Sequence, residues 1–397
     1  MPVDFQQINA RIREIGAGAR ERQRLLGERA AEARKRLGNL DSELEFLRRR
    51  VEAAKAVDPS IRCALPVTES LSASFPPPPV PDQVTLIAAD GSQINPDRHS
   101  PIQFGVVNVG AVIMRLRSGD VPQIRTESDL LYGEDLETNF GSMTEGMVAL
   151  RRDLKEREAL DELSKDLSGQ IVTFTDGPIE LWGAKGEDAQ AFSEFVEKYK
   201  SVLSRLGSRG VVTAGYVDKP AADLVVRLLE IASMTEQEFT HLQTLRESHP
   251  LRGVADRWLY GEGEEPLLPP GYRSAVFGLQ SGSEKKYAGL LALHFFYLNV
   301  GSSGHPWPVR VEIPRWVVDD PNKLNLLHAV LVEQCGIMGS QPYPYLLHRA
   351  HETAVVGFQE KSQVEQMLAL ELRRQDQTPG DESHKQVAKD SSGNRSR

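Results

Sequence analysis

The sequence predicts an α/β fold, because apolar runs typical of buried strands alternate with helical segments between residues 84 and 373. A helical or coiled-coil segment (1–57) and a proline-rich linker (58–83) precede this domain, and a polar tail (374–397) follows it. With 397 residues and a hydrophobic content of 40%, the chain is long enough to bury a sizeable core.

The N-terminal segment is predicted to form a long helix within a helical hairpin or coiled coil. Five apolar residues follow the three-four spacing of a heptad seam: Leu37, Leu40, Leu44, Leu47 and Val51. We expect this segment to pack in cis or to bind a partner, with its many charges on a solvated face. The run "SFPPPPVPD" (74–82) cannot continue a helix or a central strand, because proline lacks an N–H donor and fixes φ.

The domain itself opens with three predicted strands, "VTLIAAD", "FGVVNVGAVIMRLR" and "VPQIRTES", the last two joined by a Ser-Gly-Asp turn. A helix over 141–168, the strand "QIVTFTDGPIELWG" and a further strand and helix continue the alternation. Residues 235–285 are expected to be irregular or inserted. Two more strands, "YAGLLALHFFYLNVG" and "WPVRVEIPRWVV", are followed by helices over "LNLLHAVLVEQCGI" and from about Leu346. The tail from about Arg374 is expected to be disordered, because it has almost no apolar residues.

Composition narrows the class of protein. The formal net charge of -9 argues against nucleic-acid binding through bulk positive charge, although it leaves room for a local basic cleft. The two cysteines, Cys63 and Cys335, lack the spacing of a zinc site or a disulfide framework, which fits a reducing cytoplasm. Neither a membrane span nor a signal pattern is found, so we expect a cytoplasmic protein with no membrane association.

Two carboxylates stand where buried strands end. Asp90 closes "VTLIAAD" and Asp176 closes "IVTFTD", and each is followed by glycine. Ligands and metals gather at strand ends in α/β sheets, and two adjacent carboxylates repel each other unless a cation bridges them. A hard divalent cation such as Mn²⁺ or Mg²⁺ would suit this pair. The alternative is that both residues only form turns.

The intervening helix offers a third carboxylate. Glu156 shares a stripe with Leu160, Leu163 and Leu167, whereas Glu158 points away from it. A carboxylate on an apolar face is costly to desolvate unless it has a partner, so Glu156 is the candidate metal ligand. Glu158, two residues further on, remains the alternative.

The C-terminal region contributes aromatic and imidazole groups. Tyr343, Tyr345, His348 and His351 fall within nine residues, and His351 is a candidate for holding a metal or orienting a water. Lys219, at the end of "VVTAGYVDK", is a candidate phosphate contact, with an ordinary surface lysine as its alternative. A structural histidine is the alternative for His351.

Taken in order, these motifs resemble the NurA nuclease family. The segments that carry the resemblance cover most of residues 84–358: "IAADGSQ", "RRDLKEREAL", "FTDGPIELW", "AGYVDKP", "PPGYRSAVF", "FFYLNVG", "VRVEIPRWV", "LHAVLVEQC" and "YPYLLHRAHETAV". The resemblance implies an RNase H-like fold, with a mixed sheet of about five strands and flanking helices. It also implies a Mn²⁺-dependent DNA nuclease, with 5′-to-3′ exonuclease and single-strand endonuclease activity. Such a nuclease is generally a homodimer that works with the hexameric ATPase HerA in DNA end resection.

Carried over to this sequence, the family's first aspartate falls on Asp90, its helix glutamate on Glu156, its second aspartate on Asp176 and its histidine on His351. The family's Tyr-Pro element, a DNA contact, matches Tyr343 or Tyr345. Two other hypotheses remain: a non-catalytic RNase H-like module that recruits a repair ATPase, and a related nuclease with a different substrate. The first predicts no metal-dependent cleavage, and the second predicts the same metal site.

Overall fold

The computed structural model describes residues 4–138, 141–182, 189–261 and 266–377. The chain divides into two compact units, each built from two separate stretches of sequence. Unit 1 comprises Met1–Pro79 and Tyr216–Val332, and unit 2 comprises Val80–Gly215 and Glu333–Arg397. The first division falls in the proline-rich run, which contains no helix or strand from residue 76 to residue 81.

Unit 2 contains the strands predicted to open the α/β domain. Its elements are β3 (Val84–Ile94), β4 (Phe104–Arg115), β5 (Gln123–Tyr132), η1 (Gly133–Leu136), β6 (Glu137–Thr138), β7 (Gly141–Ser142), α4 (Glu145–Ser164), β8 (Gln170–Asp176), α5 (Ala189–Ser208), α11 (Tyr345–Ala354) and α12 (Phe358–Arg374). β9 (Val212–Val217) and α10 (Pro321–Ile337) each begin in one unit and end in the other.

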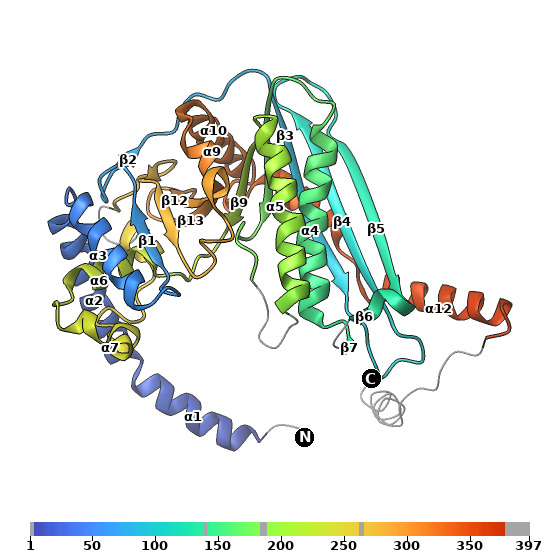
Figure 1. Cartoon of the computed structure of the whole chain (residues 1–397), viewed down its shortest axis with the longest axis horizontal. Helices are drawn as coiled ribbons and strands as arrows, with labels where there is room; N and C mark the ends of the chain where they lie inside the picture. Colours follow the sequence, from blue (N-terminus) through green and yellow to red (C-terminus); the bar gives the residue numbers. More distant parts are fainter. Residues whose placement is uncertain (1–3, 139–140, 183–188, 262–265, 378–397) are drawn as a thin grey trace. The chain divides into compact units, whose positions relative to one another are not determined.

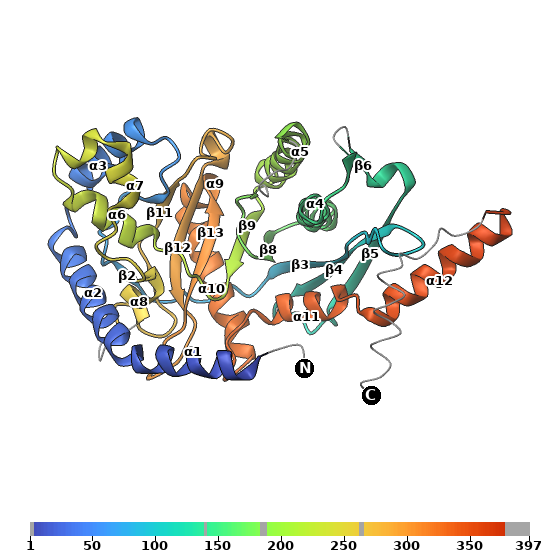
Figure 2. The same cartoon turned by 90° about the horizontal axis from the view of Figure 1, so that it is seen from below.

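The sheet of unit 2 is mixed. Its strand order is β9, β8, β3, β4, β5, with β3 parallel to β8 and antiparallel to β4. Helices α4 and α5 cover one face, and α11 lies across the other (Figures 1 and 2). The strands β3 and β4 are apolar runs whose residues are almost all buried up to Ala89 and Val112, as expected for strands covered on both faces. This mixed sheet with flanking helices confirms the expected fold class.

Unit 1 holds the N-terminal helices and the later strands. Its elements are α1 (Phe5–Ala17), α2 (Ala19–Asn39), α3 (Leu44–Val57), β1 (Cys63–Pro66), β2 (Ser74–Phe75), α6 (Leu224–Ser233), η2 (Glu238–Thr240), α7 (Leu242–Glu247), α8 (Asp256–Gly261), β10 (Arg273–Ser274), β11 (Phe277–Gln280), η3 (Gly289–Leu291), β12 (Leu293–Asn299), β13 (Pro308–Pro314) and α9 (Arg315–Val318). Its main strands follow the order β1, β11, β12, β13, and each neighbouring pair is antiparallel.

The N-terminal segment is helical, as expected, but it is not one long helix: α2 ends at Asn39 and α3 begins at Leu44, so the apparent heptad seam crosses a turn. Two other expectations about these elements were wrong. Residues 58–83 contain two strands as well as the proline run, and residues 235–285 contain short helices and strands. One strand from each of these two segments, β1 and β11, pair with each other across more than 200 residues, a contact that local periodicity does not reveal. The expected disorder of the tail lies mostly outside the described residues.

The described part of the chain contains no helix that is both long enough and apolar enough to span a membrane.

Candidate active site

The candidate site is built around Asp90 and Gly91 on β3. The register of the parallel pair places Ala89 beside Thr175, so Asp90 and Asp176 come next on two adjacent strands. Adjacent strands lie about 4.8 Å apart, which makes the two aspartates neighbours in the sheet. The register places the two aspartates at neighbouring positions, as predicted, but the prediction that β3 ends at Asp90 was wrong: β3 continues through Gly91 to Ile94, paired with β4.

His351 approaches Asp90 from α11. Its Nδ1 lies 2.7 Å from Oδ2 of Asp90, while Oδ1 accepts a hydrogen bond from the N–H of Gly91 at 2.9 Å. The imidazole is 61% exposed, whereas the Asp90 side chain is only 15% exposed. Asp90 therefore holds one nitrogen of a ring whose remaining edge is accessible.

The close approach of α11 depends on Gly110. This residue pairs with Asp90 across β3 and β4, and a Cβ built on it would lie 2.6 Å from the carbonyl oxygen of Ala350 and 2.7 Å from the amide nitrogen of Ala354. Both contacts are with backbone atoms of α11, which cannot move independently of the helix. Glycine at this position therefore lets α11 bring His351 to Asp90.

The C-terminal end of α11 is fixed by two polar side chains. The amide of Asn108 on β4 donates to the carbonyl of Ala354 at 2.7 Å, and the hydroxyl of Ser92 on β3 donates to the same carbonyl. Asn108 accepts in turn from the hydroxyl of Ser128 at 2.6 Å. A helix ends with unpaired carbonyls, so these donors satisfy one of them and set the position of the helix.

Glu156 reaches Gly91 from α4, on the other face of β3. A Cβ on Gly91 would lie 2.7 Å from Oε1 of Glu156 and 2.5 Å from Cγ of Arg152. Successive strand residues point to opposite faces of a sheet. Asp90 therefore faces α11, and Gly91 faces α4. Glu156 is 6% exposed, while the side chain of Glu158 is 42% exposed and lies 3.8 Å from Lys155. The prediction that Glu156 faces inward is confirmed.

Burial raises the pKa of Glu156 well above its ordinary value, and the neighbouring carboxylates of Asp153 and Asp90 raise it further. Arg152 opposes the shift, with its Nε 3.5 Å from Oε1 of Glu156. A negative charge on Glu156 is thus disfavoured by the site as it stands. A cation is the kind of ligand that would stabilise this charge, and carboxylate oxygens are the donors that Mn²⁺ and Mg²⁺ prefer.

The donor set fits a divalent cation in its chemistry, but its side chains do not converge on one point. Among the residues that the structure describes, no group of three or more His, Cys, Asp or Glu side chains is placed to share an ion. Asp90 turns toward His351, and Glu156 lies against Arg152. Asp176 is exposed at the end of β8.

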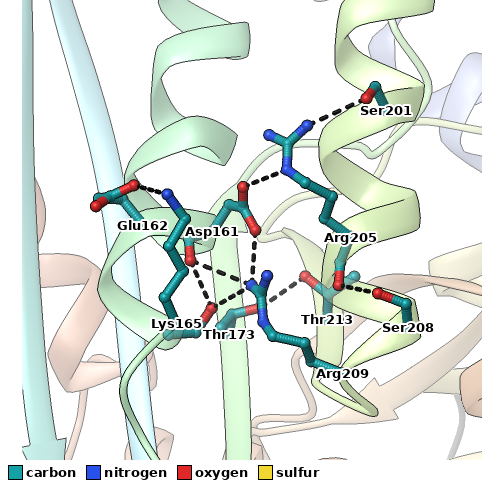
Figure 3. A network of polar contacts seen from close by, with 10 residues as sticks. Asp161, Glu162, Lys165, Thr173, Ser201, Arg205, Ser208, Arg209 and Thr213 are labelled. Carbon is teal, nitrogen blue, oxygen red and sulfur yellow. Dashed lines mark hydrogen bonds and ion pairs between the residues drawn. The ribbon is translucent and has the colours of Figure 1, made fainter.

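Helix α4 is fixed by an ion-pair network near its C-terminal end (Figure 3). Asp161 is 3% exposed, and its carboxylate accepts from Arg205 at 2.6 Å and from Arg209 at 2.6 Å, both on or next to α5. Burial acts to raise the pKa of Asp161, but the hydrogen bonds from Arg209 and Arg205 outweigh it and lower the pKa. The network joins α4 to α5 and so supports the helix that carries Glu156.

The remaining predicted residues are more dispersed. Tyr345 is the first residue of α11 and Tyr343 lies two residues before it, and both are half-buried. Lys219 follows β9 and belongs to unit 1, whereas the other candidates belong to unit 2. Sequence reasoning missed Gly110 and Asn108. The only signal for Asn108 was a polar residue inside the otherwise apolar run "FGVVNVGAVIM".

Comparison with solved structures gives distant similarities. The NurA nuclease from Sulfolobus solfataricus is 11% identical, with a TM-score of 0.49, over 93% of this chain and 98% of that one. The catalytic domain of human Endonuclease V is 13% identical, with a TM-score of 0.33, over 82% of this chain and 98% of that one. No curated protein matches the sequence.

The sequence also matches a protein-family model. The model of the NurA domain matches residues 84–356, which contain every candidate site residue. This range covers well over half of the 397-residue chain. The chain therefore belongs to the NurA domain family.

Proposed function

We propose that this protein is a divalent-metal-dependent deoxyribonuclease, and that it hydrolyses phosphodiester bonds of DNA at a site centred on Asp90. Membership of the NurA family supports a nuclease role. The observation that carries the proposal is the set of groups around Asp90: Asp176 at the next position of the adjacent strand, His351 in contact at 2.7 Å, and Glu156 against Gly91. Carboxylates on adjacent strands are what a cation site for phosphoryl chemistry needs.

The ligands that we assign to the cation are Asp90, Asp176, Glu156 and His351, with Mn²⁺ preferred and Mg²⁺ as the alternative. When bound, a divalent cation would supply Lewis-acid chemistry at the scissile phosphate. The chain's own part is positioning. Asp90 fixes the imidazole of His351, and the packing of α4 on Gly91 holds Glu156 against β3 on the other face of the strand. Lys219 and a tyrosine, Tyr343 or Tyr345, are proposed as DNA contacts.

The finer features of the proposal rest on the family resemblance. They are 5′-to-3′ exonuclease and single-strand endonuclease activity, a homodimer, and cooperation with a HerA-like ATPase in end resection during double-strand break repair. We place this activity in the cytoplasm, where the two buried free cysteines, Cys63 and Cys335, would stay reduced. Light scattering of the purified protein, alone and mixed with a HerA-type ATPase, tests both assemblies.

The catalytic proposal is tested with end-labelled single-stranded and duplex DNA in the presence of Mn²⁺, Mg²⁺ or EDTA. Asp90→Asn and Asp176→Asn should reduce cleavage to the level seen in EDTA, because each removes a carboxylate charge from neighbouring positions on β3 and β8. The exposed Asp166, near the C-terminal end of α4, provides the control Asp166→Asn, which should cleave like the wild type.

Undiminished cleavage by Asp90→Asn would remove the proposed site. DNA binding without metal-dependent cleavage by the wild type would favour the non-catalytic module instead. A parallel assay on labelled RNA distinguishes the related nuclease with a different substrate.

A further inference from the structure

A small pocket in unit 1 combines aromatic and cationic side chains. It has a volume of about 180 Å³ and is lined by residues from the end of β9, from α8 and from the segment that enters β13: Asp218, Lys219, Arg257, Trp258, Gly261, Pro306, Trp307 and Pro308. This is smaller than the roughly 300 Å³ at the low end of drug-sized ligand sites, so the pocket would enclose only part of a nucleotide.

The charges of the pocket favour an anion. Its single carboxylate, Asp218, already accepts a hydrogen bond from the indole Nε1–H of Trp307 at 3.0 Å. The buried Nε of Arg257 has no hydrogen-bond partner within the described part of the chain. A buried donor without a partner costs free energy, and an anionic acceptor would satisfy it.

The aromatic groups favour a base. The guanidinium of Arg257 lies 5.7 Å from the ring centroid of Trp258, and the hydrogen bond to Asp218 fixes the orientation of Trp307. Both indoles are only half-buried, so their faces remain available for contact. Stacking of a base on an aromatic ring contributes about 1–3 kcal/mol per base and tolerates any sequence.

We propose that this pocket binds one nucleotide of a single-stranded DNA segment, with the base against Trp258 or Trp307 and the phosphate at Arg257 and Lys219. The proposal rests on the proposed function, since it gives the nuclease a second contact with its substrate. It adds a contact outside unit 2, which carries Asp90 and the other acidic candidates.

Binding is measured in EDTA by fluorescence anisotropy of a short single-stranded oligodeoxynucleotide with a label at one end, over a range of salt concentrations. Either Trp258→Leu or Trp307→Leu should weaken binding roughly tenfold without changing the salt dependence, because the base stacks on one of the two rings. Arg257→Gln should weaken binding and reduce the slope of log K against log salt by about 0.7, the value for one phosphate contact on a single strand.

Two further variants control for folding and charge. Arg257→Lys should keep the wild-type slope, because it keeps the cation, and the exposed Arg252→Gln, in the same unit, should bind like the wild type. Equal affinity and slope for Arg257→Gln and Arg252→Gln would overturn the pocket, whether or not the wild type cleaves DNA. Wild-type protein that binds through the pocket but does not cleave would overturn the nuclease proposal and leave the pocket standing.

Discussion

At the scale of single residues, two glycines decide where the functional side chains lie. Gly91 leaves room for Arg152 and Glu156 of α4, and Gly110 leaves room for the backbone of α11. Both glycines lie in strand interiors, where glycine weakens a strand and often marks a close approach of another backbone. The weakening of the two strands is offset by the packing of α4 and α11, which these glycines allow to approach the sheet.

Gly110→Ala tests this placement. The new methyl group would lie 2.6 Å from the carbonyl oxygen of Ala350, so α11 must move away from β4 and carry His351 away from Asp90. We expect a loss of about 1–3 kcal/mol in unfolding free energy from overpacking, and a fall in cleavage rate of up to roughly a hundredfold from misplacement. Chemical denaturation and the DNA cleavage assay measure the two effects.

Gly105→Ala is the matched control, because it lies in the same strand and its Cβ would meet its nearest neighbour, the carbonyl oxygen of Ile94, at 3.2 Å. It should be much milder in both assays. If the two variants cleave DNA equally well, the seating of α11 on Gly110 does not position His351.

The sequence predicted part of this site and not the rest, for a physical reason. Asp176 and the inward face of Glu156 follow from a strand end and from helical periodicity, which are local properties. Asp90 was selected as a strand end too, although β3 continues past it to Ile94. The contact of His351 with Asp90 depends on Gly110 and Asn108, whose importance comes from a helix more than 200 residues away in the chain. No spacing in the sequence identifies such a contact.

At the scale of elements, the ion-pair network of Asp161 decides how α4 meets α5 (Figure 3). Asp161→Ala would leave Arg205 and Arg209 without their shared carboxylate. Breaking a fully buried pair costs about 3–5 kcal/mol, but the two arginine side chains are 47% and 28% exposed, so we expect a loss of about 2 kcal/mol. Urea unfolding of the variant measures it.

The next residue supplies the control. Glu162 pairs with Lys165 on the solvent side of the same helix, with side chains 70% and 45% exposed, and such pairs contribute about 0–1 kcal/mol. Glu162→Ala should therefore unfold close to the wild type. A similar loss for both variants would mean that removing any carboxylate from this end of α4, and not breaking the buried network, accounts for the effect.

The elements that sequence reasoning placed well are long and strongly patterned, such as β3, β4 and α4. Those it misplaced depend on distant partners. The three-four spacing from Leu37 to Val51 predicted one helix, yet the chain turns at residues 40–43 and the buried members Leu37, Leu47 and Val51 belong to α2 and α3. Two consecutive helices packed in one core produce the same three-four spacing of apolar residues as one long helix.

At the scale of the whole molecule, the chain folds as two units that each combine two separate stretches of sequence. The sequence suggested a helical segment, a linker and a single domain, because a linear reading assigns neighbours in sequence to the same unit. Unit 1 instead brings residues up to Pro79 together with residues from Tyr216 onward, and its stability depends on contacts between those stretches. A buried carboxylate in the later stretch of unit 1 accepts hydrogen bonds from several elements of this unit.

Asp256 is this carboxylate. It is fully buried and accepts hydrogen bonds from the N–H groups of Val225 and Val226, at the start of α6, and from the hydroxyl of Tyr297 on β12. Burial raises its pKa from 3.8 to about 6, although the three donors act in the opposite direction. The folded state therefore binds a proton more tightly than the unfolded state does.

The protonated form of Asp256 contributes stability that is fully present below about pH 4, and this contribution is lost as the pH rises through about 6, with a total near 3 kcal/mol. Asp256→Asn cannot titrate, so the difference in unfolding free energy between wild type and variant should change by about this amount between pH 4 and pH 7. Any cost of the amide beside the Val225 N–H is the same at both pH values.

Tyr297→Phe removes a donor that lowers the pKa of Asp256, so it should move the pH window of this stability change to higher pH. A difference in unfolding free energy from the wild type that stays flat with pH in both variants would contradict the titration of Asp256.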